Sequence, residues 1–347
     1  MTATMERTMT DPATMQATEP RTETLTLAKA VNEGLRAAMR HDDKVVLMGE
    51  DIGPLGGVFR VTDGLQAEFG EQRVVDTPLA ESGILGTAIG MAMRGYRPVC
   101  EIQFDGFVFP AYDQITTQLS KMFNRTRGKI QVPVVVRIPY GGGIGAVEHH
   151  SESPEVLFTH TAGLRVATPA TPQDAYTMIQ EAIACPDPVI FFEPKGRYWS
   201  KGDVDLGAPV GSDTLNKARI ARAGTDITLV AYGPTVATAM KSAEALAAEG
   251  RSAEVVDLRA LSPLDTGTLV ESVRKTGRCV VIHEAPVFYG VGAEIAARVT
   301  EECFYALEAP VLRVGGFHMQ YPIAKLEHDY LPSVDRILDA VDRAFAH

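Results

Sequence analysis

Asp76-Thr77-Pro78-Leu79-Ala80-Glu81-Ser82-Gly83 stands where a predicted strand over 73–76 meets a predicted helix over 81–94. In parallel α/β sheets, ligands bind outside the carboxyl ends of the strands. The carboxylate of Glu81 is therefore a candidate site group. It could equally serve only to complement the helix dipole, because acids are favoured in a first helical turn without any ligand.

The first half of the chain repeats this alternation of strand and helix. Apolar residues at helical spacing predict a helix over 25–40, and Val45-Val46-Leu47-Met48 predicts a buried strand. Further strands are predicted over 98–103, 133–138, 164–167 and 188–192, and further helices over 108–123, 154–159 and 172–184. This pattern is typical of an α/β domain with a largely parallel sheet, which we place at residues 24–193.

A polar stretch containing glycine and proline follows, and we expect residues 194–216 to be an interdomain linker. A second alternation then predicts a smaller α/β domain at residues 217–347. Its strands are predicted over 227–231, 253–258, 279–283 and 311–314, and its helices over 235–248, 265–275, 292–302 and 334–346. A chain of 347 residues is long enough for two such domains.

Composition limits the partners and the compartment. With 33 basic and 44 acidic residues the net charge is −11, and no basic run with interleaved aromatic residues occurs. Nucleic acid is thus not expected as a partner, and a basic protein module is. Four cysteines far apart, without a Cys-x-x-Cys motif, argue against disulfides and fit a reducing, cytoplasmic setting.

The N-terminal residues 1–23 have the features of neither a signal peptide nor a transit peptide. We expect them to form a disordered arm. No apolar run in the sequence approaches the ~20 residues that a membrane-spanning helix needs, so no membrane partner is expected.

A second informative segment, Glu101-Ile102-Gln103-Phe104-Asp105-Gly106-Phe107, follows the strand predicted over 98–103. Gln103, Phe104 and Phe107 should therefore flank the same strand-end crevice as Glu81. Phenylalanines after a buried strand more often belong to a core than to a binding site, so these two do not establish binding by themselves.

The glycine-dense segment 141–148 predicts a loop, since so many glycines disfavour regular structure. His149-His150-Ser151 follows it, just ahead of the helix predicted over 154–159. Adjacent histidines in a loop commonly face solvent, although an imidazole can also donate a proton near neutral pH. The segment His283-Glu284-Ala285-Pro286 lacks the second histidine of a zinc motif, because position 287 is valine, and is expected to be structural.

Taken together, these segments resemble the thiamine diphosphate half-site in the β subunit of 2-oxo acid dehydrogenases, the thiamine-dependent decarboxylating component of those complexes. The resemblance runs from about residue 25 to the C-terminus. It implies a pyrimidine-binding first domain and a second domain like the transketolase C-terminal domain. The cofactor-binding residues that it implies are Leu79, Glu81, Gln103, Phe104 and Phe107, with Glu81 hydrogen-bonded to the pyrimidine ring nitrogen and Phe107 stacked on the ring.

The family's pattern places an active-site histidine directly before the serine, which is His150 here. The implied reaction is oxidative decarboxylation of a 2-oxo acid with acyl transfer to a lipoyl group, in which Glu81 and His150 are catalytic and His150 protonates the departing thiolate. Gln103 resembles the branched-chain enzymes, which are the first expectation, whereas Phe107 is typical of pyruvate-specific ones. A pyruvate dehydrogenase β subunit and a noncatalytic two-domain α/β binding subunit are the alternatives.

The chain has no Gly-Asp-Gly run followed by Asn-Asn. The resemblance therefore implies that an alpha subunit holds the diphosphate and Mg²⁺ in an α₂β₂ heterotetramer, whose second β domain docks a basic module of the lipoyl acyltransferase core. It also implies a structural potassium ion bound mainly by backbone carbonyls. The residues implied for that site are Val132, Val134, Val135, Ala182, Cys185 and Asp187, although Cys185 stands where relatives usually have aspartate.

Overall fold

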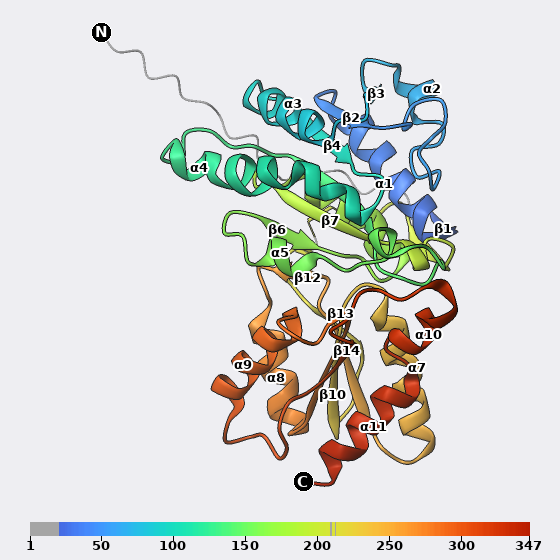
Figure 1. Cartoon of the computed structure of the whole chain (residues 1–347), viewed down its shortest axis with the longest axis vertical. Coiled ribbons are helices and arrows are strands. Elements are labelled where there is room, and N and C mark those ends of the chain that lie inside the picture. Colours follow the sequence, from blue (N-terminus) through green and yellow to red (C-terminus); the bar gives the residue numbers. More distant parts are fainter. Residues whose placement is uncertain (1–20, 209, 212) are drawn as a thin grey trace.

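The computed structural model describes residues 21–208, 210–211 and 213–347, which form two α/β units stacked along the long axis of the molecule (Figure 1). Most of the arm predicted at residues 1–23 lies outside the described residues. Its end is ordered, because Thr22 and Glu23 belong to β1 (Thr22–Thr26), which pairs antiparallel with β8 (Lys201–Asp205). The prediction of disorder is thus wrong at these two residues, and the stretch 194–216 expected as a linker contains a strand.

The first sheet has seven strands in the order β12-β6-β7-β5-β4-β2-β3, and all neighbours are parallel except β12 and β6. The central strands are fully buried runs, as a parallel sheet covered on both faces requires. Their bounds are β2 (Val45–Gly49), β3 (Val74–Asp76), β4 (Arg97–Glu101), β5 (Val135–Tyr140), β6 (Arg165–Ala167), β7 (Val189–Pro194) and β12 (Ala260–Ser262).

Helices cover both faces of this sheet. The side chains of α1 (Leu27–His41) and α6 (Pro172–Ala184) pack together on one face, and α3 (Glu81–Met93) packs on the other. Side-chain caps start the first two, with Thr26 accepting from the Lys29 amide and Thr171 from the Asp174 amide. Short helices also lie in this half of the chain, among them α2 (Leu65–Phe69), η4 (Glu148–His150), α5 (Glu155–Thr159) and η5 (Lys195–Arg197).

The helix predicted over 108–123 is broken into four pieces. They are η1 (Asp105–Ala111), η2 (Gln114–Gln118), η3 (Leu119–Lys121) and α4 (Met122–Arg125). Pro110 within η1 has no N–H to donate to a helical ladder. Hydroxyl groups also bond back to carbonyls four residues earlier, from Thr116 to Tyr112 and from Ser120 to Thr116, which favours local departures from the α-helix.

The second sheet has the order β14-β13-β10-β11-β9, and only β9 is antiparallel to its neighbour. Helices α7 (Thr235–Ala248) and α11 (Val334–Phe345) cover one face, and α8 (Thr266–Thr276) and α9 (Val291–Cys303) cover the other. The strands are β9 (Arg219–Arg222), β10 (Ile227–Ala231), β11 (Ala253–Asp257), β13 (Cys279–Pro286) and β14 (Leu312–Gly316), with η6 (Ala324–Leu326) and α10 (Glu327–Tyr330) between β14 and α11.

The two units share structure across their boundary. One continuous apolar cluster includes Ile190 and Phe192 of the first sheet and Val230 and Val256 of the second. Strand β12 comes from the second half of the chain yet adds an edge to the first sheet. Across the described residues, no helix is both long and apolar enough to span a lipid bilayer.

Candidate active site

Two carboxyl groups meet at the carboxyl ends of β2 and β3. Glu81 is the first residue of α3 and is only 6% exposed, and its carboxylate makes no hydrogen bond or ion pair with the described residues. Glu50, directly after β2, is equally buried. Burial raises the pKa of Glu50, and the nearby charges of Glu81 and Asp51 raise it further. Sequence reasoning missed Glu50, although its place after a buried strand could have indicated it.

Strand order explains why the predicted residues gather here. Because β2 lies between β4 and β3, the segments after these three parallel strands share one edge of the sheet. Gln103 also lies at this edge, where its Nε2 donates to Asp51 Oδ2 at 3.2 Å. Leu79, on the loop before α3, is 79% exposed and contacts little of this chain.

An aromatic group stands beside these carboxyls. The rings of Phe104 and His150 are stacked, with centroids 4.0 Å apart and planes at 21°. Phe107 meets Phe104 edge-on at 5.9 Å and His150 edge-on at 5.1 Å. The structure therefore brings together three residues that the sequence indicated separately, and the phenylalanines are half-buried rather than part of the core.

The loop carrying His150 lies directly over the segment after β4. A Cβ on Gly106 would overlap the backbone carbonyl of His149, so only glycine permits this approach. The half-buried His150 has Nδ1 2.9 Å from the His149 carbonyl, which leaves its Nε2 free for another partner. His149 is exposed, and its nearest polar partner is Glu148 at 3.4 Å.

A buried ion pair supports the loop from beneath. Lys195 Nζ donates to Asp105 Oδ1 at 2.6 Å, and Asp105 Oδ2 accepts the Glu152 amide at 2.9 Å. Burial raises the pKa of Asp105 to about 6 against the pull of Lys195, and burial lowers the pKa of the lysine. Sequence reasoning missed this pair, since its members lie 90 positions apart.

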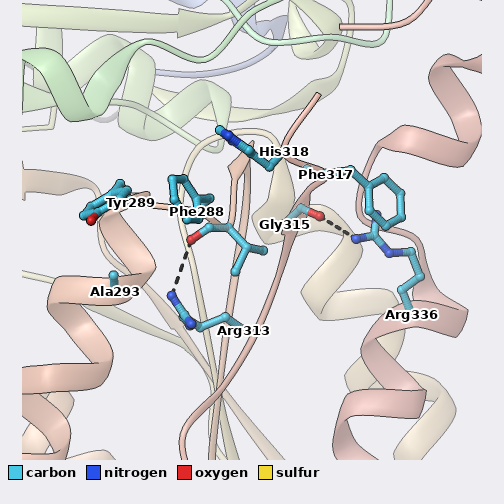
Figure 2. Close-up of a pocket in the computed structure, with 10 residues that line it drawn as sticks. Phe288, Tyr289, Ala293, Arg313, Gly315, Phe317, His318 and Arg336 are labelled. Atoms are coloured by element: carbon cyan, nitrogen blue, oxygen red, sulfur yellow. Dashed lines mark hydrogen bonds between the residues drawn. The ribbon is translucent and has the colours of Figure 1, made fainter. Parts of the chain in front are cut away.

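Two cavities lie away from the Glu81 crevice. One, of about 250 Å³, opens between the domains beside Ser151, Glu152, Glu284 and Tyr321. The other, of about 550 Å³, lies on the second domain at the ends of β13 and β14 (Figure 2). Its arginines already donate to backbone carbonyls, Arg313 to Val287 and Arg336 to Gly315 (Figure 2). Among the described residues, those lining this second cavity include two arginines and a histidine but no acidic side chain.

The carbonyls expected to bind potassium are largely engaged. Val134 O accepts the Val189 amide, and Arg97 Nη1 donates to the carbonyls of Ile183, Ala184 and Cys185 at 2.8, 3.3 and 3.5 Å. Asp187 Oδ2 pairs with Arg165 Nε at 2.9 Å. A guanidinium group thus supplies the positive charge at the carboxyl end of α6. Within the described ranges, no group of three or more His, Cys, Asp or Glu side chains is arranged to hold a metal ion.

His283 is a structural residue of the second domain. Its Nδ1 lies 2.8 Å from the Ala285 carbonyl, and burial lowers its pKa to about 4. Glycines 290, 292 and 315 lie against its ring, where a Cβ would crowd it. The adjacent Glu284 points instead to the glycine loop of the first domain, as described below.

The two domains have the α/β architecture of transketolase-type domains, and comparisons with known proteins agree. Residues 23–200 match the transketolase pyrimidine binding domain, and residues 216–337 match the transketolase C-terminal domain. A solved split-gene transketolase, described as an inactive β4 tetramer, has the same fold, with a TM-score of 0.75 at 23% identity over 93% of this chain and 98% of that one.

Two curated relatives narrow the class to one family. The pyruvate dehydrogenase E1 component subunit beta of Leifsonia xyli is 63% identical, over 95% of this chain and 97% of the relative. The 3-methyl-2-oxobutanoate dehydrogenase subunit beta of Mycobacterium tuberculosis is 53% identical, over 93% and 92%. The chain belongs to the E1 beta subunits of thiamine-dependent 2-oxo acid dehydrogenases.

Proposed function

We propose that this chain supplies the pyrimidine half of a thiamine diphosphate site that decarboxylates a 2-oxo acid and passes the acyl group to a lipoyl arm. The supporting observation is the buried, unpaired carboxylate of Glu81 beside Glu50, whose Oε1 also has no partner among the described residues. A buried carboxyl oxygen without a partner, such as Glu50 Oε1, is costly unless a ligand completes it. The donor groups of an aminopyrimidine fit that need.

Bound thiamine diphosphate would supply the carbon nucleophile that attacks the 2-oxo acid. The protein's part is to hold the pyrimidine and to move protons. In this proposal Glu81 accepts a hydrogen bond from, or gives a proton to, the ring nitrogen, and the neighbouring Glu50, whose pKa is raised by burial and by the Glu81 charge, lies next to it. Leu79, Gln103, Phe104 and Phe107 line the binding region, with Phe107 against the ring.

His150 is proposed to protonate the thiolate that leaves the lipoyl disulfide. Its half-buried ring is stacked on Phe104 at the end of a loop, where an incoming arm can reach it. His150→Ala should keep decarboxylation, measured with an artificial electron acceptor, within about threefold of wild type, while transfer to a lipoyl domain falls by about 100-fold or more. His149→Ala is the matched control and should leave both rates intact.

The two half-reactions give distinct outcomes for His150. An equal fall of both rates would assign His150 to cofactor or substrate binding, and no change in either rate would contradict its proposed catalytic role. A noncatalytic two-domain binding subunit, the alternative from a different class, would be favoured if the variants of both Glu81 and His150 kept full activity.

We propose an alpha subunit as the obligatory partner, in an α₂β₂ heterotetramer with the site at the α/β interface. The sequence has no Gly-Asp-Gly run followed by Asn-Asn, so Mg²⁺ and the diphosphate are assigned to the partner. The exposed Leu79 next to the buried Glu81 fits such an interface. A lipoyl acyltransferase core is proposed as a further partner, and the four free cysteines support a cytoplasmic setting.

Two substrates have separate support. Gln103 favours branched-chain 2-oxo acids by its resemblance to those enzymes, and the relative at 53% identity is named for 3-methyl-2-oxobutanoate. Phe107 and the name of the relative at 63% identity favour pyruvate. Specificity constants of the reconstituted heterotetramer for both acids, measured side by side, decide between them.

A potassium ion is a lesser proposal. It would have to bind beside or in place of the Arg97 guanidinium at the carbonyls after α6. Thermal unfolding in potassium and in sodium salts at equal ionic strength tests it. A midpoint that does not differ between the two salts would contradict the proposed site.

A further inference from the structure

The two ends of the loop that carries His150 lie side by side. The Gly141 amide donates to the Glu152 carbonyl at 3.0 Å, so residues 141–152 leave and rejoin the first domain at one point. His149 and His150 lie in the second half of this loop. Interactions that fix the first half of the loop therefore also restrict the position of His150.

Three side chains of the second domain pack against the first half of the loop, two of them by hydrogen bonds to its amides. Glu284 Oε2 accepts the Gly142 amide at 2.9 Å, and the two carboxylate oxygens of Glu327 accept the Gly143 and Gly145 amides at 2.9 and 3.1 Å. Tyr321 OH donates to Glu327 Oε1 at 2.7 Å. We call Glu284, Tyr321 and Glu327 the carboxylate clasp.

The loop sequence fits the clasp closely. A Cβ on Gly142 would overlap the Tyr321 hydroxyl, and one on Gly141 would lie 2.6 Å from Glu284 Oε2. Gly141, Gly143 and Gly145 have φ of +79°, +90° and +68°, which only glycine adopts at little cost. The glycines thus bring three amide donors, those of Gly142, Gly143 and Gly145, against the clasp, in an arrangement that residues with side chains could not copy.

The other end of the loop is held by the first domain itself. Asp105, buried with Lys195, accepts the Glu152 amide, and the backbone at His149 rests on Gly106. His150 therefore stands between an anchor in its own domain and an anchor in the second domain. The direction in which its Nε2 points therefore depends on both anchors.

We propose that Glu327 and Glu284 are positioning residues that let the second domain set the placement of His150 for acyl transfer. The inference rests on the proposed role of His150. It assigns to the second domain a part in the acyl-transfer step, although within the loop the clasp carboxylates bond only to backbone amides.

The test uses the assembled, thiamine-loaded heterotetramer with Glu327→Ala. Glu327→Ala removes two hydrogen bonds that the loop's backbone amides donate to a carboxylate. Hydrogen exchange of the 141–150 peptide should therefore become roughly tenfold or more faster. Transfer to a lipoyl domain should fall by about tenfold, while decarboxylation with an artificial acceptor stays within about twofold. Glu327→Gln keeps one acceptor oxygen and should show a smaller change of the same kind, and it replaces the alanine variant if that one fails to assemble.

The matched control is Glu301→Gln, an exposed glutamate of α9 that makes no contact with the loop. It should change neither exchange nor transfer. The double variant Glu327→Ala/His150→Ala should transfer no more slowly than His150→Ala alone, because a positioning residue acts through the group it positions.

Unchanged exchange of the 141–150 peptide in Glu327→Ala would overturn the clasp. Full additivity of the two substitutions would overturn its action through His150. A normal transfer rate in His150→Ala alone would instead contradict the proposed role of His150. Because that result comes from a different variant, the two failures can be told apart.

Discussion

At the scale of single residues, the site depends on a carboxyl group that has no hydrogen-bond or ion-pair partner among the described residues. Glu81 is buried at the start of α3, and the neighbouring Glu50 has a raised pKa because both burial and the Glu81 charge disfavour its ionised form. Such a pair suits a ligand that brings hydrogen-bond donors. An acid that merely complemented a helix dipole would gain nothing from a second buried acid beside it.

Glu81→Gln should preserve folding and assembly while lowering decarboxylation by about 100-fold or more, because glutamine keeps the shape and loses the titrating proton. Steady-state rates of the assembled enzyme at saturating thiamine diphosphate measure this effect. The control is Glu71→Gln, an exposed glutamate ahead of β3, which should behave as wild type. Near-normal turnover of fully assembled Glu81→Gln would contradict a role for Glu81 in proton transfer.

At the scale of elements, α3 presents an unusually bare face. Ser82, Gly83, Gly86, Thr87 and Gly90 are exposed along it, while Leu85 and Ala88 face the core. A Cβ on Gly90 would meet nothing within 4 Å in this chain. Small residues on one face allow another helix to approach closely, so this face is proposed to pack against the alpha subunit.

Gly90→Leu tests that packing. The isolated chain should fold as stably as wild type, because the leucine enters open space, whereas the concentration needed for heterotetramer assembly should rise by about tenfold or more through overpacking. Sedimentation over a dilution series measures assembly, and Gly90→Ala should have a much smaller effect. Assembly of Gly90→Leu at wild-type concentrations would place the alpha subunit elsewhere.

Sequence patterns predicted regular elements better than irregular ones. Strand β10 and helix α7 have the predicted bounds, since a buried run and an amphipathic repeat are local signals. The broken helix after β4 and the edge strand β12 were missed, because proline, hydroxyl back-bonds and a partner strand far along the chain decided them. For the site, strand-end logic grouped Gln103, Phe104 and Phe107 with Glu81, but it gave no sign of the clasp, whose carboxylates lie 142–184 positions from the glycines that they bind.

At the scale of the whole molecule, the two domains are joined by buried acids. Tyr232 OH at the end of β10 donates to Glu155 Oε1 of α5 at 2.6 Å. Burial raises the pKa of Glu155 to about 7, and the nearby Glu284 charge adds to the rise. Glu284 itself has a pKa raised to about 7, mainly by burial. Both groups thus hold a proton in the folded state at pH values where the unfolded chain has lost it.

The sign of the pH dependence follows from these shifts. Between about pH 4.5 and 7 the folded state binds more protons than the unfolded state, so this contribution to stability is present at low pH and is lost as pH rises through 7. Glu155→Gln removes one titrating group. Between pH 5 and pH 8 its free energy of unfolding, measured with urea, should therefore decrease less than that of the wild type, by about 1–3 kcal/mol. Equal slopes in both proteins would contradict a shifted Glu155.

The claim that this chain holds only half of a cofactor site is tested most directly by calorimetry. Thiamine diphosphate with Mg²⁺ is titrated into the chain alone, into its alpha subunit alone and into the reconstituted heterotetramer. The chain alone should bind with a dissociation constant no lower than about 1 mM, because its sequence has no Gly-Asp-Gly run followed by Asn-Asn, whereas the heterotetramer should bind at least about 100-fold more tightly. Submillimolar binding by the chain alone would contradict the split site.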